Sequence, residues 1–110
     1  MKDILIKELL SLVIDTKIGN CHIDNNEIVY YEGNEDSPKD YIRINLDTLG
    51  RLCKEYCYKL GYEVDTNITG WYRISKNTDN IFNVVKDGEQ MSELAAIIHS
   101  TKWIVNQKEQ

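Results

Sequence analysis

Two pairs of residues in this 110-residue chain consist of cysteine and histidine, the types of side chain that can bind zinc or act as nucleophiles or bases. Cys53 and Cys57 lie four positions apart, which places both thiols on one side of a helix, and His22 directly follows Cys21. Cysteine and histidine are the usual ligands of structural zinc, so one interpretation is a site that combines the two pairs. Adjacent residues of a strand point to opposite faces, which makes Cys21 and His22 a poor chelating pair. The spacing therefore favours cysteines buried in a core, and we expect no metal and no cofactor.

A second interpretation makes Cys21 a nucleophile with His99 as its base. Such a thiol needs a lowered pKa and a base within hydrogen-bond reach, and nothing in the neighbouring sequence supports this. The chain also has no glycine-rich phosphate loop, no GxSxG and no HExxH motif. These absences exclude particular enzyme families and favour a binding protein over an enzyme.

The net charge of −5 is concentrated in one segment of the chain. Residues 21–40 contain six carboxylates and one lysine, whereas the other 90 residues contain twelve basic and twelve acidic side chains. An acidic loop can serve solubility alone. The sharper hypothesis is a negative patch that recognises the basic surface of a protein partner, and direct binding of nucleic acid is not expected. The candidate partner-binding residues of this segment are Glu32, Glu35, Asp36 and Asp40.

The last predicted helix offers a second candidate surface. Its expected core stripe comprises Leu94, Ile97, Ile98, Thr101, Ile104 and Val105. Trp103 lies on the opposite side of this helix, four positions after His99. A tryptophan outside the core stripe is either covered by another segment of the chain, such as the first helix or the acidic loop, or anchors a partner. We therefore include His99 and Trp103 among the partner-binding candidates, with a homodimer through this face as an alternative.

Local signals predict the elements that must position these side chains. The patterns indicate helices at about 3–15, 46–60 and 90–107. For the second helix Asn45 is the expected N-cap, and Gly61 is the expected C′ residue that directly follows its end. Asn25-Asn26 predicts a tight hairpin. Strands occur in runs joined by short turns, so we predict a single α+β domain over residues 1–110, with a mainly antiparallel sheet of five to six strands.

The cysteine count and the hydrophobic pattern suggest a cellular compartment. Three cysteines do not make a disulfide framework, and Lys7 and Glu8 interrupt the first apolar run, unlike in a secretory signal. No stretch approaches the roughly 20 apolar residues of a spanning helix. We expect a cytoplasmic protein that does not bind membranes.

Residues 46–105 show a sequence of features that can be compared with known domains. A capped helix leads into KLGYEV at 59–64, and strands follow at GWYRI (70–74) and around Ile81-Phe82, before a helix through residues 93–97. This arrangement resembles small phage-encoded sandwich domains of the phage ABA sandwich type. The resemblance implies a small accessory protein of a mobile element that acts by binding, and it implies no catalytic residue.

Two functions from different classes follow. The first is a non-catalytic, phage-type accessory or inhibitor protein with an anti-defence role, which binds a host protein that handles nucleic acid. The alternative is a small-molecule or nucleotide-binding domain, either a purely ligand-binding or a hydrolytic one. Its pocket would be lined by tyrosines and Trp71, and His22, His99 or Cys21 would supply polar chemistry.

Overall fold

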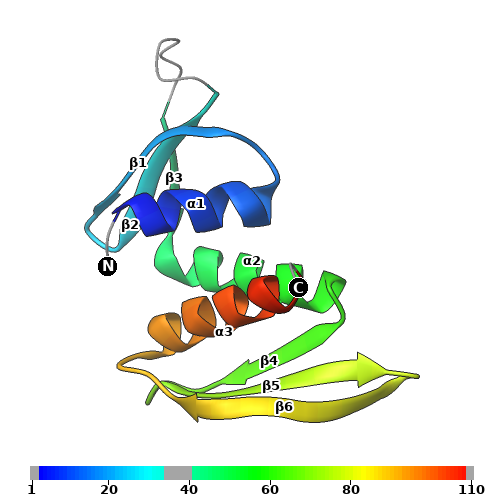
Figure 1. Cartoon of the computed structure of the whole chain (residues 1–110). Helices are drawn as coiled ribbons and strands as arrows, with labels where there is room; N and C mark the ends of the chain where they lie inside the picture. The colour runs from blue at the N-terminus through cyan, green and yellow to red at the C-terminus, as the bar shows by residue number, and fades with distance from the viewer. Residues whose placement is uncertain (1–2, 34–40, 109–110) are drawn as a thin grey trace. The chain divides into compact units, whose positions relative to one another are not determined.

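The computed structural model describes residues 3–33 and 41–108, with the side chains of residues 6–33 and 41–107 (Figure 1). Over these residues the chain has an α+β fold with three helices and six strands. In chain order the elements are α1 (Asp3–Ile14), β1 (Ile18–Asp24), β2 (Glu27–Glu32), β3 (Ile42–Asn45), α2 (Leu46–Lys59), β4 (Tyr62–Thr66), β5 (Trp71–Thr78), β6 (Ile81–Glu89) and α3 (Glu93–Lys108). Contacts divide the chain into two compact units, Met1–Leu49 and Gly50–Gln110. Whether all 110 residues act as one domain stays a prediction.

The strands form two antiparallel sheets of three, whereas the sequence predicted one sheet of five to six strands. Both sheets follow chain order, β1-β2-β3 and β4-β5-β6. At Asn45 β3 passes directly into α2 without a loop. The three strands that follow α2 pair with one another and not with the first sheet.

In the first unit, α1 packs against β1 through an apolar side whose residues recur at helical spacing. Ile6, Leu9 and Leu10 are at most 4% exposed. The predicted hairpin between β1 and β2 is confirmed, because Asn25 and Asn26 both have the positive φ values, 50° and 65°, that a tight primed turn requires. The central strand β2 is buried on both faces from Ile28 to Tyr31.

The predicted ends of α2 are confirmed by its hydrogen bonds. The side-chain oxygen of Asn45 accepts a bond of 2.7 Å from the backbone N–H of Thr48, which is the geometry of an N-cap. Gly61 has a φ of +92°, and its N–H donates to the carbonyl of Tyr58 at the end of the helix. These two signals are local, which explains why the helix boundaries could be predicted to within a residue.

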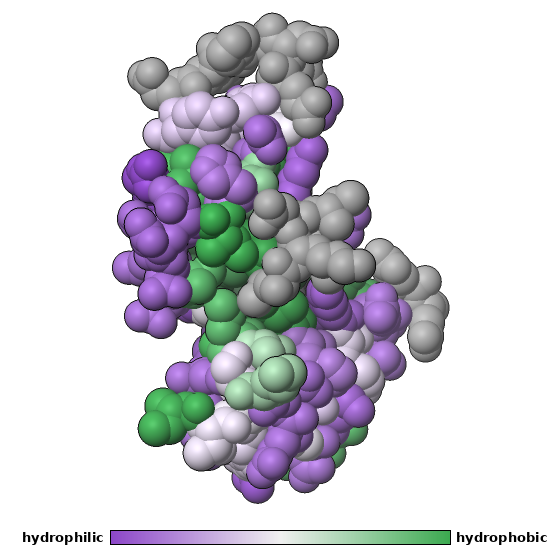
Figure 2. Space-filling view, turned by 90° about the vertical axis from the view of Figure 1, so that its left-hand side faces the viewer, coloured by the Kyte–Doolittle hydropathy of each residue, from purple (hydrophilic) through white to green (hydrophobic). Residues whose placement is uncertain are grey.

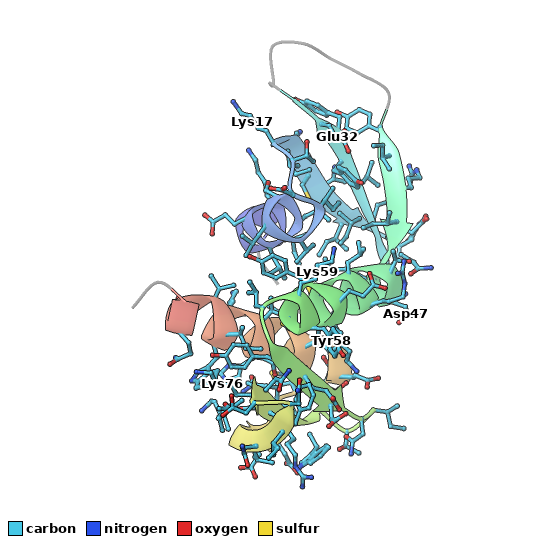
Figure 3. The ribbon with its side chains drawn as sticks, turned by 90° about the vertical axis from the view of Figure 1, so that its right-hand side faces the viewer. Lys17, Glu32, Asp47, Tyr58, Lys59 and Lys76 are labelled. Atoms are coloured by element: carbon cyan, nitrogen blue, oxygen red, sulfur yellow. The ribbon has the colours of Figure 1, made fainter. Side chains whose placement is uncertain are left out.

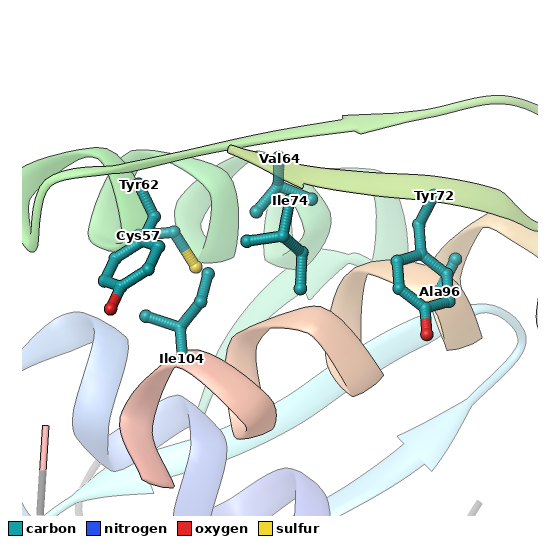
Figure 4. Packing of buried hydrophobic residues seen from close by; sticks show 7 residues of the cluster. All are labelled: Cys57, Tyr62, Val64, Tyr72, Ile74, Ala96 and Ile104. Carbon is teal, nitrogen blue, oxygen red and sulfur yellow. The ribbon is translucent and has the colours of Figure 1, made fainter. Parts of the chain in front are cut away.

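The core of the second unit lies between the sheet β4-β5-β6 and α3 (Figure 4). Figure 4 shows the side chains of the sheet and those of α3 pointing toward one another. The cluster consists of Cys57, Tyr62, Val64, Tyr72, Ile74, Ala96 and Ile104, all less than 7% exposed. Alternate residues of β4 and β5 supply it, so the opposite face of this sheet carries the intervening side chains.

The third helix begins three residues later than the predicted start at residue 90. The strand β6 continues to Glu89, and the N–H of Gln90 still donates to the carbonyl of Gly70 at 2.8 Å. Ser92 then caps the helix, since its hydroxyl accepts a bond of 3.2 Å from the N–H of Ala95. No helix among the described residues is long and apolar enough to cross a membrane.

Candidate protein-binding surfaces

The structure describes only part of the acidic segment. Glu35, Asp36 and Asp40 lie outside the described residues, and Glu32 is the last residue of β2, half-buried opposite Ile18. Figure 3 shows Glu32 at the same end of the first unit as Lys17. The backbone carbonyl of Lys17 accepts a 2.8 Å hydrogen bond from the N–H of Gly33, the residue after Glu32. Glu32 is thus the last carboxylate of the acidic segment before residues 34–40, which lie outside the described residues.

Two other carboxylates of this segment share one cation. The guanidinium of Arg43 lies 3.5 Å from the carboxylate of Asp24 and 3.6 Å from that of Glu27. All three side chains are more than 40% exposed, so each pair stabilises the fold little. Arg43 does compensate part of the charge on the sheet, which concentrates the uncompensated charge of the segment toward residues 32–40.

An aromatic cluster beside these charges was not predicted from the sequence. The Tyr41 ring meets the rings of Tyr31 and His22 edge to face, at centroid distances of 5.3 and 6.4 Å. Tyr31 is buried over Gly19, which has no room for a β-carbon, whereas Tyr41 remains 55% exposed. The cluster comes from three segments, so only the strand register could have revealed it.

The cysteines are buried in two separate places. Cys21 and His22 follow the predicted alternation, with the thiol 5% exposed in the core and the imidazole on the exposed side of β1. Cys53 and Cys57 are fully buried, and the thiol of Cys57 donates to the hydroxyl of Thr101 at 3.6 Å. Among the described residues no group of three or more histidine, cysteine, aspartate or glutamate side chains is placed to hold a metal ion.

Burial removes the reactivity of the α2 thiols. It raises the pKa of Cys53 to about 12, against the smaller opposing effect of its hydrogen bond with Thr101. Burial also raises the pKa of Cys57. A thiolate is the nucleophilic form of cysteine, so these two side chains are placed for packing and not for covalent chemistry.

His99 and Trp103 both contact the sheet of their own unit. The Trp103 ring meets Tyr62 edge to face at 6.5 Å and packs against the core cluster. The His99 ring lies 5.2 Å from that of Tyr72. Its pKa is lowered, first by burial and then by the charges of Lys86 and Lys102. The participation of both residues in partner binding stays a prediction.

Helix α3 is apolar on two sides, and each side packs against a different element of the second unit. One side, with Ala96 and Ile104, faces the sheet in the core cluster. The other side faces α2, because Ile97 lies 3.1 Å from the position of a β-carbon on Gly50, and Thr101 accepts the bond from Cys57. A helix packed between a sheet and a second helix must be apolar on both sides.

The outer face of the second sheet carries charged side chains from three strands. We use the name outer face for Glu63, Asp65, Trp71, Arg73, Asp87 and Glu89. The register places Arg73 between Asp65 on β4 and Asp87 on β6, and it places Trp71 opposite Glu89. The guanidinium of Arg73 lies over the Trp71 ring, 5.1 Å from its centroid. Four carboxylates against one cation give this face a charge of −3.

This outer face also separates residues of the predicted pocket. Trp71 lies on it, whereas His99 contacts Tyr72, which points to the opposite, helix-covered face. Cys21 and His22 belong to the first unit. The structure therefore does not bring Trp71 and His99 together around one ligand.

Comparisons with known proteins add no assignment. No family model matches the chain, and neither a curated protein nor a solved structure matches it significantly. The resemblance to phage sandwich domains stays a prediction.

Proposed function

We propose that this protein is a non-catalytic binding protein that recognises the basic surface of a protein partner. The observation that carries the proposal is the charge of residues 21–40, which equals the net charge of the whole chain. Arg43 compensates one of the two charges of Asp24 and Glu27, so most of the uncompensated charge belongs to Glu32 and the residues that follow it in the sequence. Concentrated charge of this kind accelerates association with an oppositely charged surface.

The environment of the thiols supports binding over catalysis. All three cysteines are buried, and the two on α2 have raised pKa values. Cys21 is also surrounded by the apolar core of its own unit, beside its strand partner Tyr30. The side chains with the greatest intrinsic reactivity thus contribute to packing.

From the resemblance alone we further propose a phage-type accessory or inhibitor protein. Its partner would be a host protein that handles nucleic acid, because the basic channel of such a protein suits an acidic ligand. Direct binding of nucleic acid by this chain is disfavoured by its net charge of −5. The proposed site of action is the cytoplasm.

The test compares two double charge reversals in the full chain. The partner is first captured from host lysate, purified and identified, and its association rate is then measured at several salt concentrations. The reversal Glu35→Lys with Asp36→Lys is expected to slow association by roughly tenfold at low salt and to flatten its salt dependence. The control, Glu8→Lys with Glu55→Lys, makes the same change in net charge on two exposed helical positions.

The control separates a local patch from a general charge effect. Equal slowing by both double variants would contradict the proposal, because only net charge would then matter. The absence of any stoichiometric partner, together with a thermal shift caused by a nucleotide, would favour the ligand-binding alternative. Exposed charges contribute about 0–1 kcal/mol each to stability, so both variants should remain folded.

A further inference from the structure

Lysines and carboxylates lie on opposite sides of the sheet β4-β5-β6. Residues paired across neighbouring strands share a side, and the register places Lys86 beside Ile74 and Lys76 beside Tyr62. Ile74 and Tyr62 belong to the core cluster, so both lysines are on the side against which α3 packs. The four carboxylates of these strands all belong to the outer face. The helix-facing side of the three strands therefore has two lysines and no carboxylate.

Helix α3 adds a histidine and a third lysine on this side. His99 and Lys102 are three positions apart, which makes them neighbours on the helix surface. The His99 ring lies 5.2 Å from that of Tyr72, and the register places Tyr72 opposite Gly88, two residues along β6 from Lys86. The charges of both lysines act on the imidazole and, after burial, lower its pKa. The three side chains of Lys86, His99 and Lys102, which we call the basic cluster, therefore lie close together between α3 and β6.

The hydroxyl of Tyr72 lies beside the basic cluster. A β-carbon on Gly88 would be 2.8 Å from this hydroxyl oxygen and 3.1 Å from two carbons of the ring, so the Tyr72 ring lies across the bare backbone of β6. Figure 4 shows the ring projecting from its strand toward α3 near Ala96. Among the described residues the hydroxyl makes no hydrogen bond, and solvent reaches it. It can therefore donate a hydrogen bond to a bound group.

The lysines of the basic cluster have no counterion within the described part of the chain. Lys86 and Lys102 are half-buried, and neither belongs to the ion pairs that the described residues form. The carboxylate at the start of α3, that of Glu93, accepts a 2.7 Å bond from the hydroxyl of Thr66 instead. Partly desolvated charges without a counterion are unfavourable, so a bound anion would stabilise this arrangement.

The donors of the site favour a small, doubly charged oxyanion. Ammonium groups, an imidazole and a hydroxyl all donate hydrogen bonds, and lysine binds phosphate groups as a compact point charge. A long polyanion such as nucleic acid is disfavoured, because the outer face of the same sheet has a charge of −3. On the face of the molecule in Figure 2 the surface of this unit is mainly hydrophilic, so a charged ligand that approaches from that side meets little apolar surface.

We propose that the basic cluster and the Tyr72 hydroxyl bind a tetrahedral dianion, which is either the phosphoryl group of a small phosphate monoester or inorganic phosphate itself. The ammonium groups of Lys86 and Lys102 and the imidazole of His99 contact its oxygens, and Tyr72 donates a further hydrogen bond. This site belongs to the second unit and shares no residue with the acidic segment, so it stands independently of the function proposed above.

The experiment follows the side-chain resonances of the two histidines in the isotope-labelled full chain. Sodium phosphate is added and compared with sodium chloride at equal ionic strength. Phosphate is expected to shift the His99 signals and the amides of residues 86–88 until they saturate. His22, in the first unit, is the internal control and should not respond. Equal shifts at both histidines, or no saturation at His99, would overturn the proposal.

A pH titration gives a second measurement at His99. Sulfate keeps its double negative charge over the range in which histidine titrates, and a bound dianion favours the protonated imidazole. The pKa of His99 should therefore be higher in sodium sulfate than in sodium chloride by about half a pH unit or more, with no such difference at His22. The same pKa of His99 in both salts would contradict the proposed site.

Three variants separate the site from the net charge of the chain. Lys86→Gln with Lys102→Gln should weaken phosphate binding roughly tenfold, because two charge-assisted hydrogen bonds are lost. The matched control, Lys54→Gln with Lys59→Gln, makes the same change in net charge on α2 and should leave the affinity unchanged. Tyr72→Phe keeps the ring that packs in the core and should weaken binding about threefold. An equal loss of affinity in the control would overturn the proposal.

Two ligands distinguish the sources of the dianion. Inorganic phosphate and adenosine monophosphate are titrated into the same protein under the same conditions. Tighter binding of adenosine monophosphate would assign the site to a phosphate monoester, and tighter binding of the inorganic ion would assign it to phosphate itself. Failure of both to bind would overturn the proposal, and it would leave the charge-reversal test of the acidic segment unaffected.

Discussion

Gly70 holds the turn between β4 and β5 in a conformation and a space that only glycine fits. Its φ is +95°, and a β-carbon there would lie directly against the carbonyl oxygen of Gln90 and 3.1 Å from the nitrogen of Ser92. Those atoms are backbone and cannot rotate away. The Gly70 carbonyl also accepts the 2.8 Å bond from Gln90 that joins the start of β5 to the end of β6. We expect Gly70→Ala to destabilise the protein substantially.

The magnitude follows from three costs. A left-handed conformation costs an alanine about 1–2 kcal/mol, displacement of a packed backbone costs about 1–3 kcal/mol, and loss of the bond from Gln90 costs about 1 kcal/mol. Together they predict a loss of about 3–6 kcal/mol in the free energy of unfolding, a large share of the roughly 5–15 kcal/mol typical of a folded domain.

Gly61 provides a matched control for this prediction. Its φ is +92°, almost the same as that of Gly70, but a β-carbon there would have no neighbour within 4 Å. Gly61→Ala should therefore cost only the conformational part, about 1–2 kcal/mol. Urea denaturation followed by tryptophan fluorescence and far-ultraviolet circular dichroism measures both variants. If their free energies of unfolding agree to within about 0.5 kcal/mol, the steric argument at Gly70 is wrong.

Three further predictions concern the thiols, the histidine and the turn. At pH 8 the native protein should leave its cysteines unmodified by a thiol reagent, because they are buried and the pKa of Cys53 is about 12, while denaturant should expose three reactive thiols to colorimetric titration. The pKa of His99 is lower in the folded than in the unfolded protein, so the unfolded state binds the proton more readily and the free energy of unfolding should fall as the pH drops below about 6.5. His99→Gln should show a smaller fall over the same range in parallel urea titrations, and an identical fall would refute this assignment. The side-chain oxygen of Asn67 accepts hydrogen bonds from the N–H and the hydroxyl of Thr69 and from the N–H of Trp71. Asn67→Ala removes this acceptor, so it should lower the free energy of unfolding by about 1–2 kcal/mol and with it the thermal midpoint. An unchanged midpoint would show that water replaces these bonds at no cost.

The features that could be predicted from the sequence depend on a few neighbouring residues. Asn45 caps α2 through a bond to a residue three positions away, and Gly61 ends it through a bond to Tyr58. Asn25 and Asn26 turn the first hairpin through their own φ values. Alternation along β1 correctly separated the buried Cys21 from the exposed His22. In each case the physical cause lies within one turn of helix or one hairpin.

The candidate binding residues could be predicted only in part. The charge of residues 21–40 is a property of the sequence, and the structure describes Glu32 but not Glu35, Asp36 or Asp40. The sequence placed Trp103 on the side of the last helix opposite the core stripe, but it could not show that this ring packs against the core cluster beside Tyr62. Its contact with Tyr62 joins residues 41 positions apart, and no local pattern encodes such a contact.

The amino-acid sequence by itself determined the α+β class, the three helices and the localisation of the net charge, because capping, turn conformation, periodicity and composition act over short stretches of chain. Only the tertiary structure decided that the strands divide into two sheets and that α3 is packed on two sides. It also decided that Asp65 and Asp87 flank Arg73. These outcomes depend on which distant segments pair and in which register, and a shift of one residue would turn each of these side chains to the other face of its strand.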